Sequence, residues 1–307
     1  IPVNRAGEGG GGMWRTALGA CRFWGAPLEW ASDCGQSLPR QGCDLPLETR
    51  KEPMPKFSVC IEMIFREEGV DYPERVAKAA AAGADAVEFW RWKGKDLCAI
   101  GQAASEHGVA VATFGATSER LVDASTREAF VAGVEEAIGL AGQLSCPGCL
   151  QTVGQELEGV ERATQHRAIV DALSAAAPKL EESGLKLYVE PLNILVNHQG
   201  YYLSTSDEAF EILREVASPN VLLLYDIYHQ QITEGNLIQT IEENIDLIGH
   251  FHVADVPGRN EPGTGELNYA NIFRRIDALG YAGFVGMEFK PTVDHAEAVA
   301  HTIALGA

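Results

Sequence analysis

Glu190, Asp226, His252 and Glu288 each stand near the end of a short apolar run, and the four runs follow one another along the second half of the chain. A carboxylate within an apolar strand is costly to bury unless it has a partner or binds a metal. For any one of the carboxylates alone, a buried acid satisfied by hydrogen bonds is an equally good interpretation. Four such residues at equivalent depth favour a shared metal site. Three carboxylates and one imidazole suit Mn²⁺, Mg²⁺ or Co²⁺, and they are compatible with Zn²⁺.

Two imidazoles are available to that site, in the sequence Gly249-His250-Phe251-His252. Side chains alternate along a strand, so His250 and His252 point the same way at different depths. His252 is nearer the C-terminal end of its run, and we expect it to be the ligand. For His250 we expect a supporting or packing role.

Short β-rich runs alternate with amphipathic stretches from Phe57 onward. Apolar residues recur at helical spacing in the amphipathic stretches, and Gly83, Gly108, Gly184 and Gly280 follow them where a left-handed residue would end a helix. The expected strands are 57–65, 86–90, 109–115, 149–154, 186–192, 221–227, 248–255 and 284–289. The expected helices are 73–82, 96–107, 127–144, 165–183, 206–217, 236–246, 269–279 and 295–305.

This alternation predicts an α/β fold, a (β/α)8 TIM barrel. Strands that alternate with helices form parallel βαβ units, and eight such units close naturally. A doubly wound open sheet would normally carry a glycine-rich phosphate loop after its first strand, whereas Phe65-Arg66-Glu67-Glu68 stands there. Active sites of barrels form at the C-terminal ends of the strands, so the four candidate ligands would share one rim.

Residues 1–53 differ from the rest of the chain. They contain a run of glycines, three Trp and several Pro, without helical or strand periodicity, and they lack the pattern of a signal peptide. Met54-Pro55-Lys56-Phe57 resembles a natural start just before the first strand. We therefore expect residues 1–53 to be an irregular, non-native or disordered extension and residues 54–307 to be the barrel. An unfamiliar N-terminal module is the alternative.

Composition argues against several classes of protein. A formal net charge of −19 over 307 residues is unfavourable for binding nucleic acid. No apolar run reaches the roughly 20 residues of a membrane-spanning helix, so no membrane partner is expected. Seven scattered cysteines suit reduced thiols in a cytoplasmic protein. Cys146-Pro147-Gly148-Cys149 has the spacing of a redox or zinc pair but lacks a second pair.

Several motifs of the second half of the chain support a family resemblance. They are Glu190-Pro191-Leu192-Asn193, Asp226-Ile227-Tyr228-His229-Gln230, Glu234-Gly235-Asn236-Leu237, His252-Val253-Ala254-Asp255-Val256-Pro257-Gly258-Arg259, Glu261-Pro262-Gly263-Thr264-Gly265-Glu266-Leu267-Asn268-Tyr269, Gly280-Tyr281 and Gly286-Met287-Glu288-Phe289-Lys290-Pro291. With these motifs the chain resembles the hydroxypyruvate isomerase family, within the wider xylose-isomerase-like barrels that include the ketose 3-epimerases. The resemblance extends more weakly back to Phe57, which is about five-sixths of the chain, and covers none of residues 1–53.

The resemblance implies a role for each candidate ligand. Glu190 and Glu288 would bind the metal and also act as acid/base residues, and Asp226 would be a ligand only. The seventh-strand ligand is often Gln in hydroxypyruvate isomerases, whereas His252 matches the 3-epimerases. A further Glu that 3-epimerases carry a few residues beyond the strand-five Glu is not evident, since Val196 lies near that place, and this departure favours the isomerase.

These residue types suit the removal of a proton next to a carbonyl group. A divalent ion that bridges the carbonyl and a neighbouring hydroxyl oxygen stabilises an enediolate. Glu190 and Glu288 would then move the proton: its return to the neighbouring carbon isomerises the substrate, and its return to the opposite face of the same carbon epimerises it. The family resemblance implies that the substrate is hydroxypyruvate, a small keto acid, and that the product is tartronate semialdehyde (2-hydroxy-3-oxopropanoate). The alternative is a 3-epimerase of free ketoses such as D-tagatose, D-allulose or L-ribulose.

His229, on the loop expected after strand six, and Arg259, after strand seven, are the candidate substrate binders. Arg offers a two-pronged grip on a carboxylate or a set of hydroxyls, although a solvent-facing loop arginine is the other interpretation. Glu62 and Trp90 stand near the ends of the first two strands and would wall a pocket, unless the aromatic ring fills the core.

Other classes of protein fit less well. A nuclease like endonuclease IV shares the barrel but needs several zinc ions, more His than the 8 present, and a basic DNA-binding face. A non-catalytic barrel would be expected to lose an acid/base Glu, and both are present. By analogy with similar barrels, we expect a homo-oligomer, either a dimer or a tetramer.

Overall fold

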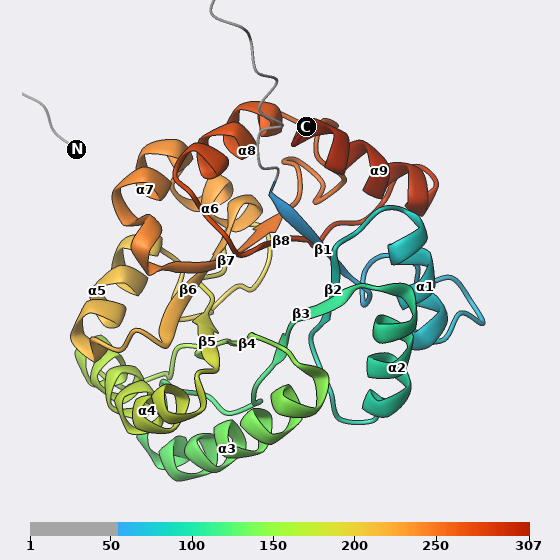
Figure 1. The fold of residues 1–307 in the computed structure, drawn as a ribbon. Helices are drawn as coiled ribbons and strands as arrows, with labels where there is room; N and C mark the ends of the chain where they lie inside the picture. The colour runs from blue at the N-terminus through green and yellow to red at the C-terminus, as the bar shows by residue number, and fades with distance from the viewer. Residues whose placement is uncertain (1–54) are drawn as a thin grey trace, which may run out of the picture. The chain divides into compact units, whose positions relative to one another are not determined.

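The computed structural model describes residues 55–307, so the extension expected over residues 1–53 lies outside the described residues. Within 55–307, parallel strands pair in sequence order and the last pairs with the first, which closes the sheet (Figure 1). The predicted (β/α)8 TIM barrel is therefore confirmed. The strands are β1 (Lys56–Cys60), β2 (Ala86–Phe89), β3 (Ala110–Gly115), β4 (Gly148–Gln151), β5 (Lys186–Val189), β6 (Val221–Asp226), β7 (Ile248–Val253) and β8 (Phe284–Met287).

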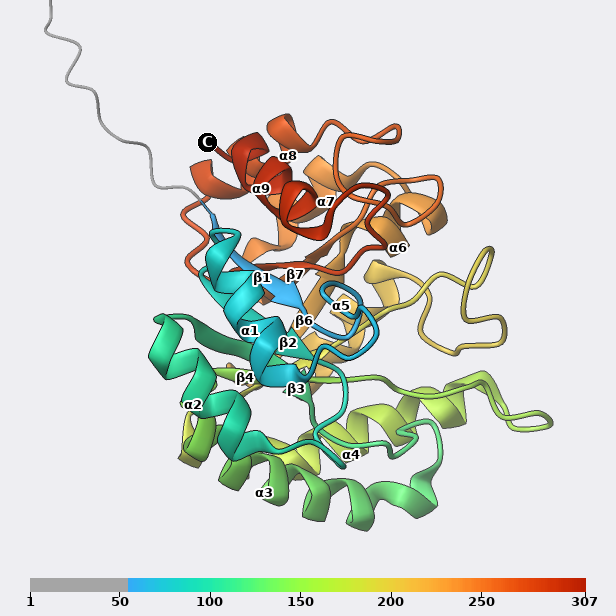
Figure 2. The same cartoon turned by 90° about the vertical axis from the view of Figure 1, so that its right-hand side faces the viewer.

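Helices surround the barrel (Figure 1). The loops after β4 and β5 project beyond the barrel on the side toward which the strands point (Figure 2). The helices are α1 (Tyr72–Ala81), α2 (Leu97–His107), α3 (Arg127–Leu144), α4 (Arg162–Ser183), α5 (Ser206–Val216), α6 (Ile227–Thr233), α7 (Leu237–Asn244), α8 (Tyr269–Ala278) and α9 (His295–Leu305), with 3₁₀ turns η1 (Ala124–Thr126) and η2 (Ile245–Leu247).

Polar side chains begin several helices by accepting hydrogen bonds from the free backbone N–H groups of the first turn. Asp71 accepts from the backbone N–H of Glu74 at 2.9 Å to begin α1, and Asp96 accepts from that of Ala99 at 3.0 Å to begin α2. At the other ends, the four glycines predicted to follow helices all have positive φ, between 70° and 96°. The predicted helix ends are thus confirmed at these four positions.

A layer of side chains fills the barrel interior beneath its C-terminal rim. Tyr188 on β5 and His250 on β7 stack with ring centroids 5.6 Å apart and planes inclined by 17°. Gly148 on β4 leaves the room that the Tyr188 ring occupies, because a Cβ there would come within 2.4 Å of the ring. Since side chains alternate along a strand, the residues two positions later on β5 and β7 point the same way, one layer nearer the rim.

All the strands except β3 end earlier than the sequence predicts, and β1 and β6 show why. β1 stops at Cys60, because the chain turns there and the backbone N–H groups of Met63 and Ile64 both donate to the Cys60 carbonyl at 3.0 Å. β6 ends at Asp226, and helix α6 begins at the next residue. Helix α6 is absent from the predicted elements, and the predicted strand 221–227 wrongly includes Ile227.

The Cys146-Pro147-Gly148-Cys149 motif spans the start of β4, and both of its cysteines pack in the core. Both thiols are free and buried, and the Cys146 thiol donates to the Gly148 carbonyl at 3.1 Å. Burial raises the pKa of Cys146 to about 12, so the reactive thiolate form is suppressed.

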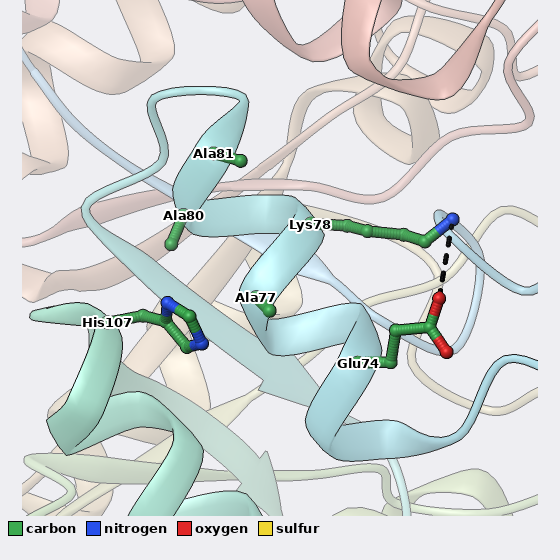
Figure 3. Close-up of a pocket in the computed structure, with 6 residues that line it drawn as sticks. All are labelled: Glu74, Ala77, Lys78, Ala80, Ala81 and His107. Atoms are coloured by element: carbon green, nitrogen blue, oxygen red, sulfur yellow. Dashed lines mark ion pairs between the residues drawn. The ribbon is translucent and has the colours of Figure 1, made fainter.

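The outer surface carries an open hollow between α1 and α2 (Figure 3). The Glu74 and Lys78 side chains pair along one face of α1 at 3.8 Å beside it. The hollow includes none of the residues identified from the sequence as candidates for chemistry; its lining consists of Glu74, Ala77, Lys78, Ala80, Ala81 and His107. None of the helices within residues 55–307 is both long and apolar enough to cross a membrane.

Candidate active site

Glu190, Asp226, His252 and Glu288 come together at the C-terminal rim of the barrel, and we call them the rim cluster. Asp226 and His252 lie on β6 and β7, and Glu190 and Glu288 follow directly after β5 and β8. One ligand atom from each side chain lies within 4.8 Å of the others, and all four residues are buried. The structure therefore brings together the four residues that the sequence nominated as metal ligands.

The rim cluster fits a divalent metal ion. Nδ1 of His252 lies 3.3 Å from Oε2 of Glu288 and 3.6 Å from Oε1 of Glu190. This nitrogen is buried and has no hydrogen-bond partner among residues 55–307. Buried carboxylates around an unpartnered imidazole nitrogen, at these separations, match ligands that one ion holds at about 2.0–2.2 Å each. A donor set richer in oxygen than nitrogen, without sulfur, suits a hard ion.

Arg259 lies against the rim cluster and does not face solvent. Its side chain is 14% exposed, and its guanidinium pairs with Glu288 and lies 3.6 Å from Oδ2 of Asp226. The guanidinium also packs over the Tyr228 ring, with Cζ 5.2 Å from the ring centroid. The interpretation of Arg259 as a solvent-facing loop residue is therefore wrong.

Glu190 and Glu288 occupy different electrostatic environments. Burial raises the pKa of Glu190, because its charged form would lose hydration. Burial also raises the pKa of Glu288, but Arg259 and His252 outweigh that effect and hold it well below its usual range. Paired carboxyl groups whose pKa values are driven apart are typical of acid/base sites.

His229 lies in the first turn of α6 and is fully buried. Its Nδ1 accepts a hydrogen bond from the backbone N–H of Asn193 at 3.2 Å and faces the Asn193 side-chain nitrogen at 2.6 Å. That nitrogen is a donor, because Oδ1 of Asn193 accepts from the backbone N–H groups of Val196 and Asn197. The ring proton therefore sits on Nε2, which lies 3.4 Å from Oδ2 of Asp226 and has no hydrogen-bond partner within the described chain.

The metal-free protein carrying His229→Asn is expected to lose less stability in acid than the wild type. Burial, followed by the charge of Arg259, lowers the pKa of His229 to about 3, against about 6.5 in an unfolded chain. Between these values the unfolded state binds a proton that the folded state does not. This contribution to stability is thus fully present above pH 6.5 and is lost as pH falls toward 3.

One such proton corresponds to a slope of about 1.4 kcal/mol of unfolding free energy per pH unit. Asn cannot titrate, and its side-chain oxygen can take the place of Nδ1 as an acceptor. Urea unfolding between about pH 6 and pH 4 should therefore give a shallower slope in the variant, by roughly that amount. Equal slopes in the two proteins would contradict the neutral state assigned to His229.

Trp90 and Glu62, both expected to wall a pocket, differ in their partners. The Trp90 indole N–H donates to Oε1 of Glu288 at 2.5 Å, and the residue is 40% exposed, so its ring forms an accessible wall beside the rim cluster. Glu62 instead pairs with Nζ of Lys95 at 2.6 Å and accepts from the Tyr72 hydroxyl at 3.1 Å. The structure thus connects Trp90 to the rim cluster and gives the Glu62 carboxylate other partners.

The fold and this site agree with comparisons to known proteins. A protein-family model described as xylose isomerase-like TIM barrel matches residues 76–305. The chain belongs to this family. It is 33% identical over 255 residues to a putative hydroxypyruvate isomerase of Homo sapiens, which covers 79% of this chain and 92% of the relative.

Other family members carry related names. The chain is 32% identical to the hydroxypyruvate isomerase of Escherichia coli and to a 2-oxo-tetronate isomerase of Cupriavidus necator, each over 246 residues covering 78% of this chain and 94% of the relative. A crystal structure described as AP endonuclease, family 2, from Brucella melitensis is 30% identical, with a TM-score of 0.77 over 83% of this chain and 100% of that one. The resemblance to hydroxypyruvate isomerases is confirmed, and the chain is an isomerase.

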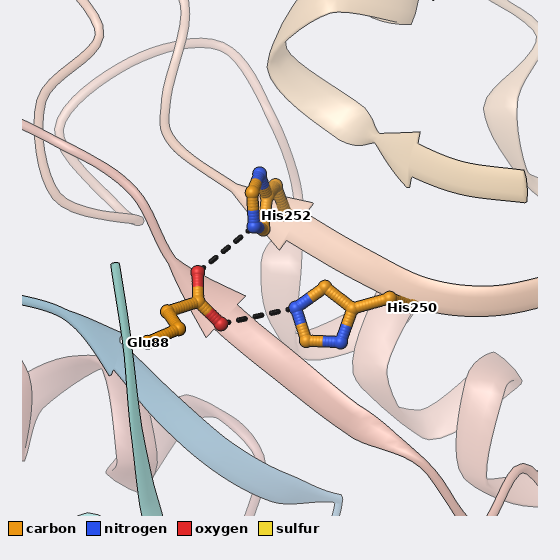
Figure 4. Close-up of side chains that lie close together, drawn as sticks. All are labelled: Glu88, His250 and His252. Atoms are coloured by element: carbon orange, nitrogen blue, oxygen red, sulfur yellow. Dashed lines mark hydrogen bonds and ion pairs between the residues drawn. The ribbon is translucent and has the colours of Figure 1, made fainter. Parts of the chain in front are cut away.

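One buried residue near the rim cluster of this xylose isomerase-like barrel was not nominated from the sequence. Glu88 on β2 is 2% exposed, and its carboxylate lies between His250 and His252 (Figure 4). Burial raises its pKa, but His252 and His250 outweigh that effect and lower it to about 2. The signal was present in the sequence, because Glu88 interrupts the apolar run Ala86-Val87-Glu88-Phe89 as the rim carboxylates interrupt theirs.

Proposed function

We propose that this chain is a divalent-metal-dependent isomerase of small keto acids, which interconverts hydroxypyruvate and tartronate semialdehyde (2-hydroxy-3-oxopropanoate). The observation that carries the proposal is that the buried carboxylates of Glu190 and Glu288 both lie within 3.6 Å of Nδ1 of His252, a nitrogen with no hydrogen-bond partner among residues 55–307. The names of the relatives support the choice of substrate.

The reaction moves one proton between neighbouring carbons. A carboxylate removes a proton from C3 of hydroxypyruvate, and the electron pair left behind moves onto the C2 carbonyl oxygen. A proton then returns to C2 while the C3 hydroxyl proton passes to the C2 oxygen, so that C3 becomes the aldehyde and C2 carries the hydroxyl. We assign these transfers to Glu190 and Glu288. An ion held by the rim cluster would polarise the carbonyl oxygen and stabilise the negative charge that develops there.

The proposed substrate binders are Arg259, His229 and Trp90. The Nε2–H of His229 is a fixed donor beside the rim cluster, suited to a carbonyl or hydroxyl oxygen. Arg259 supplies a buried positive charge for the carboxylate of a keto acid. Trp90 supplies a wall. For Glu62 we propose an indirect part, in which its pairing with Lys95 holds the loop that carries this wall.

Two other substrate classes have an observation in their favour. A relative named 2-oxo-tetronate isomerase favours a longer keto acid of the same kind. His252, at a position often held by Gln in hydroxypyruvate isomerases, favours a ketose 3-epimerase. Nuclease activity is not expected despite the description of the Brucella structure, because a net charge of −19 opposes binding to a phosphate backbone.

A substrate panel separates these possibilities. Hydroxypyruvate, 2-oxo-tetronate, D-tagatose, D-allulose and L-ribulose are offered with Mn²⁺, with Mg²⁺ or with EDTA, beside an abasic-site DNA duplex. We expect the highest kcat/KM on hydroxypyruvate, loss of turnover in EDTA and its return on adding metal. If a ketose is turned over and hydroxypyruvate is not, the protein is a ketose epimerase. Full activity in EDTA would contradict the metal requirement.

We also propose a homo-oligomer and a cytoplasmic location. Ile194, Leu195 and Val196 expose apolar side chains next to one another on the loop after β5, which supports a subunit contact. The free thiols of the four cysteines in the described chain support a reducing compartment.

A further inference from the structure

Glu88 reaches the rim cluster from a strand that does not neighbour β7. It lies on β2, and β1 and β8 separate β2 from the strand β7 that carries His250 and His252. Nevertheless, Oε1 of Glu88 lies 2.8 Å from Nε2 of His252, and Oε2 lies 3.0 Å from Nε2 of His250 (Figure 4). One buried carboxylate therefore contacts both histidines of β7.

The two intervening strands provide the path for this side chain. Ser58 on β1 donates its hydroxyl to Oε2 of Glu88 at 2.6 Å. Gly286 on β8 is in register with both Ser58 and His252. A Cβ at Gly286 would come within 2.6 Å of both Glu88 oxygens and 2.7 Å of the His252 ring. The absence of a side chain at this one position lets Glu88 cross to His252.

The contacts of Glu88 determine where the histidine protons lie. An ionised carboxylate only accepts hydrogen bonds. A ring nitrogen without a proton would place a lone pair against a carboxylate oxygen at 2.8–3.0 Å, which is repulsive, so Nε2 of both His250 and His252 carries a proton. Although the His252 contact does not meet the geometry of a regular hydrogen bond, its short distance requires the same arrangement. With the proton held on Nε2, Nδ1 of His252 is the ring nitrogen that could offer a lone pair to an ion bound between it, Glu190 and Glu288.

Glu88, His250 and His252 also form a group with the types of side chain that bind metals. Each carboxylate oxygen, however, faces a different ring nitrogen at a direct-contact distance, and Oε2 already accepts from Ser58. A single ion between the three residues would have to replace these contacts. The geometry is that of a carboxylate that orients histidines.

We propose that Glu88 is a positioning residue, which fixes the orientation and tautomer of His252 so that Nδ1 is the atom offered to the metal ion. The inference rests on the proposed function, because it assumes that the rim cluster binds a divalent ion. Carboxylates that accept from the distal N–H of a histidine ligand orient the ring and make it a better ligand. Glu88 needs no contact with substrate to act in this way.

Metal affinity of folded protein tests the proposal. Isothermal titration of metal-free wild type, Glu88→Gln and Glu88→Ala with Mn²⁺ should give affinities about 10-fold weaker for Gln, which retains an acceptor, and about 100-fold weaker for Ala. Raising the Mn²⁺ concentration should restore much of the lost turnover. The matched control is Glu261→Gln, which alters another buried carboxylate, bonded to the backbone N–H of Thr292 at 2.9 Å, and should bind Mn²⁺ as the wild type does.

Histidine NMR of ¹⁵N-labelled protein loaded with Mg²⁺ gives a second measurement. We expect the His252 ring in the Nε2–H form in wild type and Glu88→Gln, and a mixture of tautomers in Glu88→Ala. Unchanged Mn²⁺ affinity in both folded Glu88 variants, or an Nδ1–H tautomer in the wild type, would overturn the role of Glu88. Where Glu88→Ala does not fold, Glu88→Gln decides by affinity alone. Wild type that binds no Mn²⁺ would instead overturn the proposed function itself.

Discussion

Glu288→Gln is expected to lower kcat/KM for hydroxypyruvate by about 10³-fold or more, and Glu190→Gln by a similar factor. A positioned acid or base contributes about 10²–10⁴-fold to a reaction of this kind. Gln matches Glu in size but cannot take up or release a proton, and it also weakens an oxygen ligand of the proposed ion. Kinetics at several Mn²⁺ concentrations separate the two effects, because only weak metal binding is reversed by added metal.

Exchange of the C3 protons of hydroxypyruvate with D₂O, followed by NMR, distinguishes the roles of Glu190 and Glu288. A variant that exchanges these protons without forming product retains the group that acts at C3 and lacks the group that delivers a proton to C2. If neither variant exchanges them, one carboxylate takes part in both steps with the help of the other. Glu261→Gln serves again as the control and should retain turnover. Full activity in either rim variant is incompatible with the two-glutamate mechanism.

The barrel and its rim could be predicted because both depend on local patterns. Strands buried on both faces read as short apolar runs, and covering helices repeat apolar residues at helical spacing. Helices α3 and α9 have the predicted bounds, residues 127–144 and 295–305. Parallel strands in a barrel end at one rim. The proximity of residues far apart in sequence could therefore be predicted by counting strands alone.

The features that the sequence did not predict depend on contacts across the barrel or on very short elements. The place of Glu88 follows from the depth of its side chain and from the missing side chain of Gly286, and neither follows from spacing along the chain. The contact of Trp90 with Glu288 likewise joins β2 to β8. Helix α6 has 7 residues, too few to show a helical repeat, and it continues an apolar run that reads as strand.

Asp226 connects helix α6 to the rim cluster, because its two carboxylate oxygens make different contacts. Oδ1 accepts from the backbone N–H groups of Tyr228 at 2.8 Å and His229 at 3.3 Å, which begins α6. Oδ2 faces the cluster, 3.6 Å from Arg259 and 3.4 Å from Nε2 of His229. One residue therefore ends a strand, starts a helix and offers a ligand atom.

Asp226→Asn should divide these tasks. Asn begins helices about as well as Asp, so its oxygen can replace Oδ1 while its amide nitrogen takes the position of Oδ2 and repels a cation. We expect Mn²⁺ affinity to fall by more than about 100-fold, beyond the roughly 10–100-fold that loss of an orienting partner of a ligand causes. Stability of the metal-free protein should stay within about 1 kcal/mol of wild type, whereas Asp226→Ala should also lose about 1 kcal/mol of helix capping.

Thermal unfolding with and without Mn²⁺ measures both effects of Asp226→Asn. An ion present at 100 times its dissociation constant stabilises the folded state by about 2.7 kcal/mol, so wild type should melt at a higher temperature with Mn²⁺. The variant should show little or no such rise.

The metal-free melting temperature of Asp226→Asn should equal or exceed that of wild type. Burial raises the pKa of Asp226, so the charged side chain is unfavourable there without an ion. A wild-type response to Mn²⁺ in the variant would remove Asp226 from the ligand set, and a large loss of metal-free stability would show that the cap requires the carboxylate. The expected combination, in which metal binding falls while metal-free stability holds, requires that the charge of Asp226 serves the ion and its geometry serves the helix.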